Sequence, residues 1–132
     1  MPGTGVFDYL IVGGGLAAAS AVDGIREVDQ TSTIGLLTEE PEPPYQRPPL
    51  SKEFLQYEDV PRSFLYVKPE GWFEEQERIE FITRQKALVL DPVAMSVTTA
   101  RGNVFRASRI LIAPGGRARQ IQIPGYDLEG VF

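Results

Sequence analysis

Apolar and polar residues alternate in blocks along the first forty residues. Phe7 to Val12 is a nearly continuous apolar run closed by glycines, a pattern typical of a strand buried in a parallel sheet. From Gly15 to Val28 the apolar positions recur at helical spacing. Thr33 to Leu37 is a second apolar run. Strand, helix and strand within about thirty residues predict a βαβ unit with parallel strands and a right-handed crossover.

The pattern breaks between residues 38 and 49, where five prolines exclude a regular helix or a central strand. This segment predicts a stiff, extended loop. Ser51 is expected to cap a short helix after it. Pro69 to Gln76 is expected to form another short helix, which turns Trp72 and Phe73 inward.

The second half of the chain favours short strands. The strand-like runs are Ile79 to Thr83, Ala87 to Leu90, Met95 to Thr99, Val104 to Phe105 and Arg109 to Ala113. Arg101-Gly102-Asn103 is a turn signal between two of them. Together with the βαβ start, these runs predict a three-layer, Rossmann-like α/β domain. Its sheet is expected to be mainly parallel, with a small antiparallel β insertion near residues 86–106.

Composition limits the chemistry that the chain can perform by itself. Hydrophobic residues make up 42% and charged residues 23%, which is ordinary for a globular protein. There is no cysteine and no histidine, which excludes disulfides, thiol chemistry and the usual zinc ligands, and no metal site is expected. Any redox function would therefore depend on a bound organic cofactor.

Charge and hydropathy narrow the range of partners. The net charge of −5 argues against a nucleic-acid partner. No apolar run approaches the length of a membrane-spanning helix, and Met1 to Gly5 lack the pattern of a signal peptide. A cytoplasmic location is expected, or a mitochondrial one if a targeting segment has been removed.

A glycine-rich motif, Gly13-Gly14-Gly15-Leu16-Ala17-Ala18, has the form G-x-G-x-x-A. In dinucleotide-binding domains the first glycine permits a tight turn, the second lets the backbone approach a pyrophosphate, and the small third residue lets helix and strand pack closely. A plain tight turn is the alternative. The position between a strand and a helix favours dinucleotide binding, because the helix N-terminus then offers N–H groups to phosphates.

An acidic pair follows the second strand. Glu39 lies 24 residues after Gly15, near the spacing at which such domains bind a ribose, and Glu40 comes next. A solvated loop acid is the alternative. A carboxylate at this place disfavours a 2′-phosphate, so the pair favours FAD or NAD over NADP.

The proline loop, Pro43 to Lys52, carries a resemblance to a known family. It resembles the P-Y-x-R-P-P-L-S-K segment of the FAD-dependent pyridine nucleotide oxidoreductases, which include ferredoxin and rubredoxin reductases and apoptosis-inducing factor. Ser63 to Val67 is similar to the segment that follows in that family. Ile110 to Gly116 is similar to its second flavin signature, and Pro124-Gly125 to the P-G after it. An NAD-only Rossmann domain is disfavoured because it has no need for the proline loop.

The resemblance implies an FAD-binding domain over residues 5–132, as the N-terminal portion of a larger enzyme whose NAD-binding part, second FAD segment and interface domain are absent from the chain. The residues that it implies for FAD binding are Gly13, Gly14, Gly15, Leu16, Ala17, Glu39, Glu40, Arg47, Lys52, Ala87, Ala113, Gly115 and Arg119. Lys52 would also be catalytic, since a cation near the flavin N5 edge stabilises a reduced, anionic flavin. Pro114 departs from the family's usual threonine and removes a main-chain donor.

The function implied by the resemblance is electron transfer from NAD(P)H through FAD to a carrier protein or a small acceptor, with the choice between NADH and NADPH open. The isolated chain is expected to lack turnover, because the donor site would lie outside it. The alternative is a stand-alone FAD-binding or apoptosis-inducing-factor-like signalling module without turnover of its own. An incomplete FAD domain is also expected to expose apolar surface and to self-associate.

Overall fold

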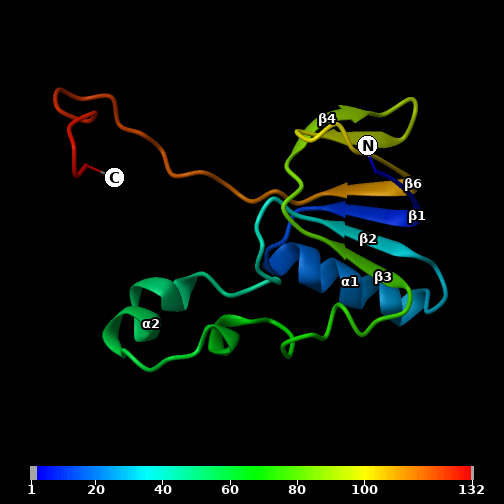
Figure 1. Ribbon diagram of the computed structural model, residues 1–132, viewed down its shortest axis with the longest axis horizontal. Coiled ribbons are helices and arrows are strands. Elements are labelled where there is room, and N and C mark those ends of the chain that lie inside the picture. The colour runs from blue at the N-terminus through cyan, green and yellow to red at the C-terminus, as the bar shows by residue number, and fades with distance from the viewer. Residues whose placement is uncertain (1–2, 132) are drawn as a thin grey trace.

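One six-stranded sheet, in the order β3-β2-β1-β6-β5-β4, organises the computed structural model, which describes residues 3–131 (Figure 1). The strands are β1 (Thr4–Val12), β2 (Ile34–Leu37), β3 (Ile79–Ile82), β4 (Ala87–Asp91), β5 (Ser96–Thr99) and β6 (Val104–Ile112). The helices are α1 (Leu16–Val28) and the short α2 (Glu53–Gln56), with 3-10 turns η1 (Pro48–Ser51) and η2 (Arg62–Leu65). Phe132, the end of the predicted domain, lies outside the described residues.

The central strand is β1, which pairs in parallel with β2 on one side and with β6 on the other. β3 pairs in parallel with β2, whereas β4 and β5 extend the sheet beyond β6 in antiparallel pairing. With α1 between β1 and β2, the predicted βαβ unit is confirmed. The predicted α/β class, with a mainly parallel sheet and an antiparallel part, is confirmed as well.

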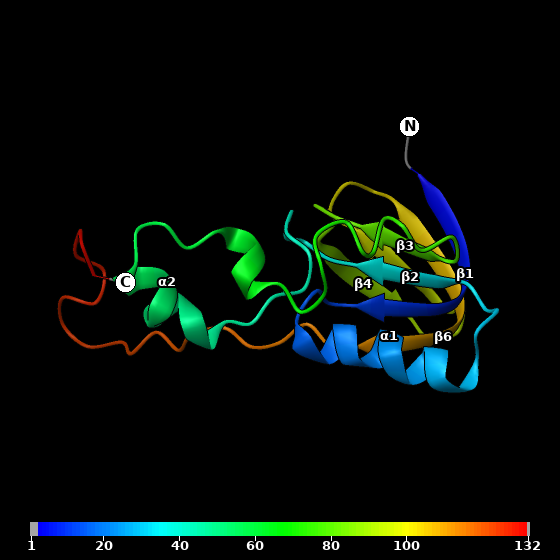
Figure 2. The same ribbon diagram turned by 90° about the horizontal axis from the view of Figure 1, so that it is seen from below.

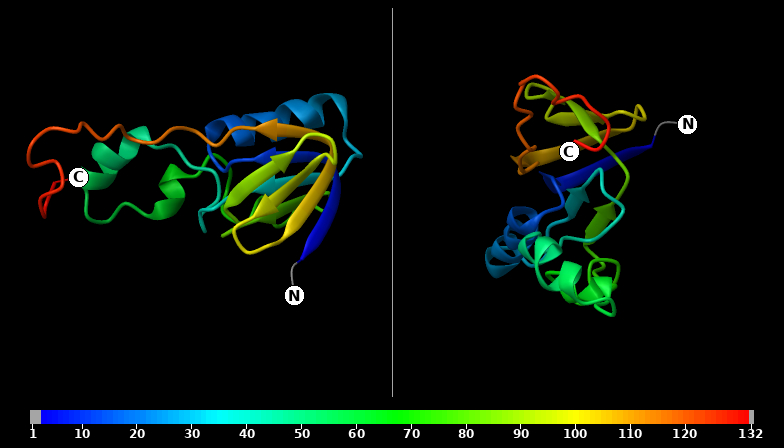
Figure 3. Two further views of the ribbon diagram at one scale, coloured as in Figure 1. Left: turned by 90° about the horizontal axis from the view of Figure 1, so that it is seen from above. Right: turned by 90° about the vertical axis from the view of Figure 1, so that its left-hand side faces the viewer.

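Two hydrophobic clusters lie on opposite faces of β1, because successive side chains of a strand point to opposite sides. Tyr9 and Ile11 face α1, which covers that side of the sheet (Figure 2). Leu10 and Val12 face the other way and share a cluster with residues of β5 and β6. The antiparallel strands run obliquely across the parallel ones (Figure 3), so the second face is covered by the curled part of the same sheet.

Two local expectations are wrong. Ser51 does not cap a helix: it ends η1, which begins at Pro48, since a proline is well suited to the first turn of a helix. Residues 69–76 form turns without a helix, although Phe73 is buried, with 1% of its surface exposed. The ring of Trp72 lies edge-on to that of Phe73, with 4.9 Å between centroids. Through this aromatic pair the turns pack against the hydrophobic cluster that includes the buried residues of α1.

The proline loop with α2, and the segment after β6, both extend from the sheet on the side to which β1, β2 and β6 point (Figures 1 and 2). Beyond Ile112, residues up to 131 contain no helix or strand in the described part. Several apolar side chains are exposed here, among them Ile121, Ile123 and Leu128. Self-association through such surface stays a prediction. None of the helices in residues 3–131 is long and apolar enough to cross a lipid bilayer.

The turn between α1 and β2 is held by an ionised carboxylate. Asp29 accepts hydrogen bonds from the Ser32 hydroxyl at 2.5 Å and the Ser32 N–H at 2.9 Å. Chiefly because of these two bonds, the pKa of Asp29 is lowered from 3.8 to about 2. A lowered pKa means that the ionised side chain contributes stability above the unfolded-state pKa, and that this contribution is lost as the pH falls through the folded one.

We therefore expect the stability of the wild type to fall between about pH 4 and about pH 2, and Asp29→Asn to flatten this part of the profile. Urea denaturation at a series of pH values measures this change in the free energy of unfolding. Asp59→Asn, at an exposed position, is the control. An Asp29→Asn profile that parallels the wild type through this range would contradict the assignment.

Candidate functional site

A cleft of about 580 Å³ lies where β1, β2 and β6 end and α1 begins. β1 has β2, the next strand in the sequence, on one side and β6, a much later strand, on the other. The strand order therefore reverses at β1, and the cleft lies at this switch point. Open parallel sheets bind their ligands at such a point, beyond the carboxyl ends of the strands. The lining residues come from the glycine loop, the end of β2, the proline loop, the start of β4 and the segment after β6.

The three glycines of the loop differ in what surrounds them. Gly13 has a φ of +135°, and a Cβ there would overlap the carbonyl oxygen of Ala113. A Cβ on Gly14 would lie 2.7 Å from the Cβ of Thr38. A Cβ on Gly15, in contrast, would meet no atom of the described chain within 4 Å. The packing of the protein therefore requires the first two glycines, whereas no contact of the described chain requires the third, which borders the cleft.

The first turn of α1 faces this opening with free backbone donors. Gly15 is the N-cap, no side chain of residues 3–131 caps the helix, and no acidic residue lies in its first turn. The first hydrogen bond of the helix runs from the Ala19 N–H to the Gly15 carbonyl, at 3.1 Å. The N–H groups before Ala19 and the positive end of the helix dipole can thus bind an anion.

The end of β2 forms the wall beside the glycine loop. Thr38 is buried, and its hydroxyl oxygen accepts a 3.2 Å hydrogen bond from the Glu40 N–H. The Glu39 carboxylate lies at the rim, 3.6 Å from the ammonium of Lys86. Because both side chains are about half exposed, this ion pair contributes little to stability. It leaves the carboxylate at the edge of the cleft, where a ribose hydroxyl could donate to it.

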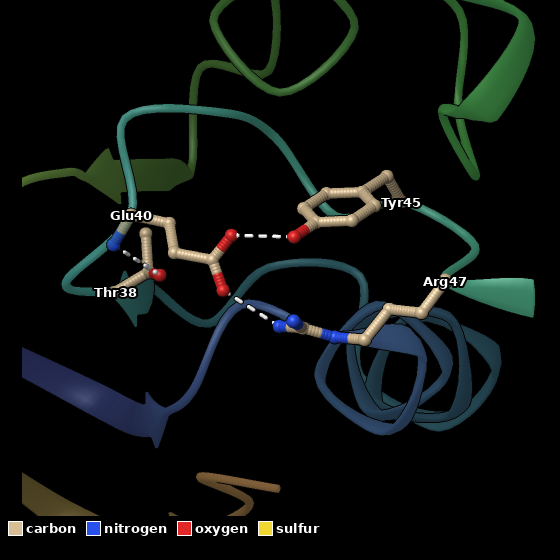
Figure 4. Close-up of polar contacts among 4 residues, drawn as sticks. All are labelled: Thr38, Glu40, Tyr45 and Arg47. Carbon is tan, nitrogen blue, oxygen red and sulfur yellow. Dashed lines mark hydrogen bonds and ion pairs between the residues drawn. The ribbon is translucent and has the colours of Figure 1, made fainter. Parts of the chain in front are cut away.

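Glu40 joins two residues of the proline loop (Figure 4). Its Oε2 accepts a hydrogen bond from the Tyr45 hydroxyl at 2.7 Å, and its Oε1 accepts one from an Nη of Arg47 at 2.6 Å. Arg47 also lies over the Tyr45 ring, 5.0 Å from the centroid. Burial alone would raise the pKa of Glu40, but these two hydrogen bonds and the charge of Arg47 outweigh it and hold that pKa below its ordinary value.

The structure brings most of the predicted site residues together around this cleft. Those that line it are Gly13, Gly14, Gly15, Leu16, Ala17, Glu39, Glu40, Arg47, Ala87, Ala113 and Gly115. Two predicted residues do not line it in the described chain. Lys52 lies between η1 and α2, and Arg119 lies in the extended segment after β6.

Several lining residues were not predicted. They are Val12, Leu37, Thr38, Gln85, Lys86, Pro114, Gly116 and Arg117. Thr38 is next to the predicted Glu39 in the sequence, and Lys86 is next to the predicted Ala87. The opposite charges of Glu39 and Lys86 could have indicated that these two residues lie close together. Arg117 lines the cleft, whereas the predicted Arg119, two residues later, does not.

Comparisons with known proteins identify the family of the chain. The sequence pattern of the pyridine nucleotide-disulphide oxidoreductase family matches residues 7–132. The ferredoxin reductase subunit of the 5,5′-dehydrodivanillate O-demethylase of Sphingobium sp. is 39% identical over 96% of this chain and 30% of its own length. Apoptosis-inducing factor 1 of Dictyostelium discoideum is 34% identical over 88% of this chain and 24% of its own length.

A solved structure is similar as well. The ferredoxin reductase for the CYP199A2 system of Rhodopseudomonas palustris has a TM-score of 0.82 at 30% identity, over 94% of this chain and 30% of its own length. The chain thus spans about a third or less of the length of the relatives it matches. The match of nearly the whole chain shows that it belongs to the pyridine nucleotide-disulphide oxidoreductase family.

Proposed function

We propose that the chain binds the adenine and diphosphate side of FAD and belongs to a flavin-dependent reductase that passes electrons from NAD(P)H to a carrier protein. The observation that carries the proposal is the cleft at the switch point, in which Gly15 leaves open space beside the unpaired amides of α1. This arrangement fits a diphosphate that bridges two nucleotide halves.

Different residues of the cleft are proposed to bind different parts of FAD. The backbone of the glycine loop and the first turn of α1 bind the diphosphate, and Arg47 adds a cation from the other side. Glu39 accepts hydrogen bonds from the ribose, and Ala87 lies along the adenine. Pro114 lines the cleft without an N–H, so this part of the wall contacts the cofactor through its carbonyl and apolar atoms.

Bound FAD would supply redox chemistry that a chain without cysteine or histidine lacks. Lys52 is proposed to approach the flavin ring in the complete protein. Its ammonium would there favour the anionic form of the reduced cofactor. Self-association of the chain and a cytoplasmic location of the parent protein stay predictions from the sequence.

The proposed acceptor is a ferredoxin-type carrier protein, because two of the relatives described above are ferredoxin reductases. A stand-alone signalling module has no specific observation in its favour. The part of the parent reductase that binds NAD(P)H is proposed to lie outside these 132 residues, since the chain spans about 30% of those reductases.

FAD binding is the direct test. We expect the purified chain to bind one FAD, measured by isothermal titration calorimetry, and to bind FMN at least about tenfold more weakly because FMN lacks the adenylate half.

Oxidation of NADH or NADPH by the chain with FAD should not exceed that by free FAD, since donor and flavin must be held in contact. Tighter binding of NADH than of FAD would contradict the proposed cofactor, and steady turnover would contradict the absence of a donor site.

A further inference from the structure

Two glutamates that precede the proline loop, Glu40 and Glu42, make the same kind of contacts at different places. Glu40 binds Tyr45 and Arg47 beside the cleft, as described above. Glu42 accepts a hydrogen bond from the Tyr66 hydroxyl at 2.7 Å and one from an Nη of Arg62, also at 2.7 Å. The two sets of contacts are chemically alike.

Their surroundings are different. Arg47 and Glu40 line the cleft that contains the glycine loop. Arg62 and Glu42 line a separate cavity of about 240 Å³ between the proline loop and η2, whose other walls are mainly apolar. If these ion pairs served only to fold the loop, the two glutamates would be equivalent. Only the pair of Glu40 and Arg47 lies at the cleft that contains the glycine loop.

We propose that Glu40 is a positioning residue for the cofactor diphosphate: it holds the guanidinium of Arg47 at the cleft before the cofactor arrives. This inference rests on the proposed function, since the diphosphate is that of the bound dinucleotide. Glu40 does not itself contact the phosphates. Both of its carboxylate oxygens are occupied by Tyr45 and Arg47, and its negative charge would repel a phosphate.

The contacts of Arg47 leave it able to bind an anion. Among the described residues, one of its Nη atoms is bonded to Glu40. A guanidinium carries five N–H donors in a planar fork, so the remaining donors are available for phosphate oxygens. The Arg47 side chain is 61% exposed, and an incoming anion can reach it.

Glu40 also fixes where this guanidinium lies relative to the glycine loop. The Glu40 N–H donates to the Thr38 hydroxyl, and Thr38 packs against Gly14. The contacts therefore run from the glycine loop through Thr38 and Glu40 to Arg47. An arginine side chain loses much rotamer freedom when it is ordered. Ordering it before binding removes that loss from the binding step and raises affinity.

The test is FAD affinity in the variant Glu40→Gln, which keeps the shape of the side chain and removes its charge. We expect the Kd for FAD to rise about tenfold. Glu42→Gln is the matched control, with the same chemical change two residues further along the same segment, and its Kd should stay within about twofold of the wild type. Thermal unfolding of both variants shows whether either change alters the fold.

A double-mutant cycle with Arg47→Met separates positioning from a general structural role. If Glu40 acts through Arg47, Glu40→Gln will no longer weaken FAD binding in the Arg47→Met background, and the loss of a like charge will tighten it slightly. An equal loss of affinity with and without Arg47 would overturn the proposal. So would a Glu42→Gln variant that weakens FAD as much as Glu40→Gln.

The failure of this inference is distinguishable from the failure of the proposed function. A wild-type chain that does not bind FAD contradicts both. A wild-type chain that binds FAD, with Glu40→Gln unchanged, contradicts only the role of Glu40. If Glu40→Gln does not fold, Tyr45→Phe tests the same contacts more gently, because it removes one hydroxyl and keeps the ring beside Arg47. It should raise the Kd by about threefold, and an unchanged Kd would count against the proposal.

Discussion

Gly13→Ala is expected to lower the free energy of unfolding by about 3 kcal/mol or more. A φ of +135° suits glycine and strains any other residue. The added Cβ would overlap the carbonyl oxygen of Ala113. Neither strand end can move aside, since the Gly13 N–H donates to Leu37 at 2.8 Å and the Ala113 N–H donates to Val12 at 2.7 Å.

Urea denaturation followed by circular dichroism measures this effect, and Gly24→Ala provides a control of opposite sign. Gly24 lies inside α1, and a Cβ there would meet no described atom within 4 Å apart from its neighbours in the helix. Alanine is the better helix former, so Gly24→Ala should stabilise the chain by about 0.5–1 kcal/mol. A Gly13→Ala variant within about 1 kcal/mol of the wild type would refute the close approach of the two backbones.

Gly15→Trp is expected to abolish FAD binding, with a loss of at least about 100-fold in affinity, while the fold is retained. Gly15 has φ −99° and ψ −166°, extended values that any residue adopts. A Cβ there meets no atom of the described chain beyond its own neighbours within 4 Å, and Gly15 lines the cleft, so the indole is expected to extend into it. It then occupies the space in which the diphosphate would lie.

Calorimetric titration with FAD, together with a thermal unfolding curve, tests both halves of this prediction. Gly15→Ala is the size control: its methyl group should weaken FAD by less than the indole does, at nearly unchanged stability. FAD affinity that is unaltered by Gly15→Trp would mean that the cofactor binds elsewhere. A loss of affinity accompanied by unfolding would contradict the open space at Gly15.

The glycine positions show what local sequence can specify. The run from Phe7 to Val12, the glycines after it and the periodic segment that follows predict β1, a tight loop and α1, because each feature depends on residues close together in the chain. The turn at Gly102 is confirmed for the same reason: its φ is +79°, and its N–H donates to Thr99 at 2.9 Å. Such turns select glycine directly.

Features that depend on distant partners were not predicted. Val104–Phe105 and Arg109–Ala113 were expected as separate strands, yet β6 runs without a break from Val104 to Ile112. The polar residues within it interrupt the apolar pattern, but β1 pairs with nearly its whole length. Likewise, the burial of Phe73 among residues of β1, β2 and α1 outweighs any helical preference of residues 69–76.

The same distinction between local and distant contacts applies to the residues of the cleft. The glycine loop and the acids after β2 could be predicted because each belongs to one local motif. Gln85 and Lys86 reach the cleft because the Gln85 N–H donates to the Thr38 carbonyl at 2.9 Å, a contact between separate parts of the chain. Whether Arg117 or Arg119 faces the cleft depends on the path of a segment without regular structure, and residue spacing does not specify that path.

The pairing of β1 with β6 has a consequence for how the protein is made. All residues of β1 except Asp8 pair with a partner 100 positions later, from Thr4 with Val104 to Val12 with Ile112. Closing so long a loop is entropically unfavourable and slow. During synthesis, β1 leaves the ribosome well before β6 has been made. Until then one edge of this apolar strand is unpaired and can form hydrogen bonds with other polypeptide chains. Folding yield should therefore depend on how quickly β6 emerges and on chaperones that shield β1 until then.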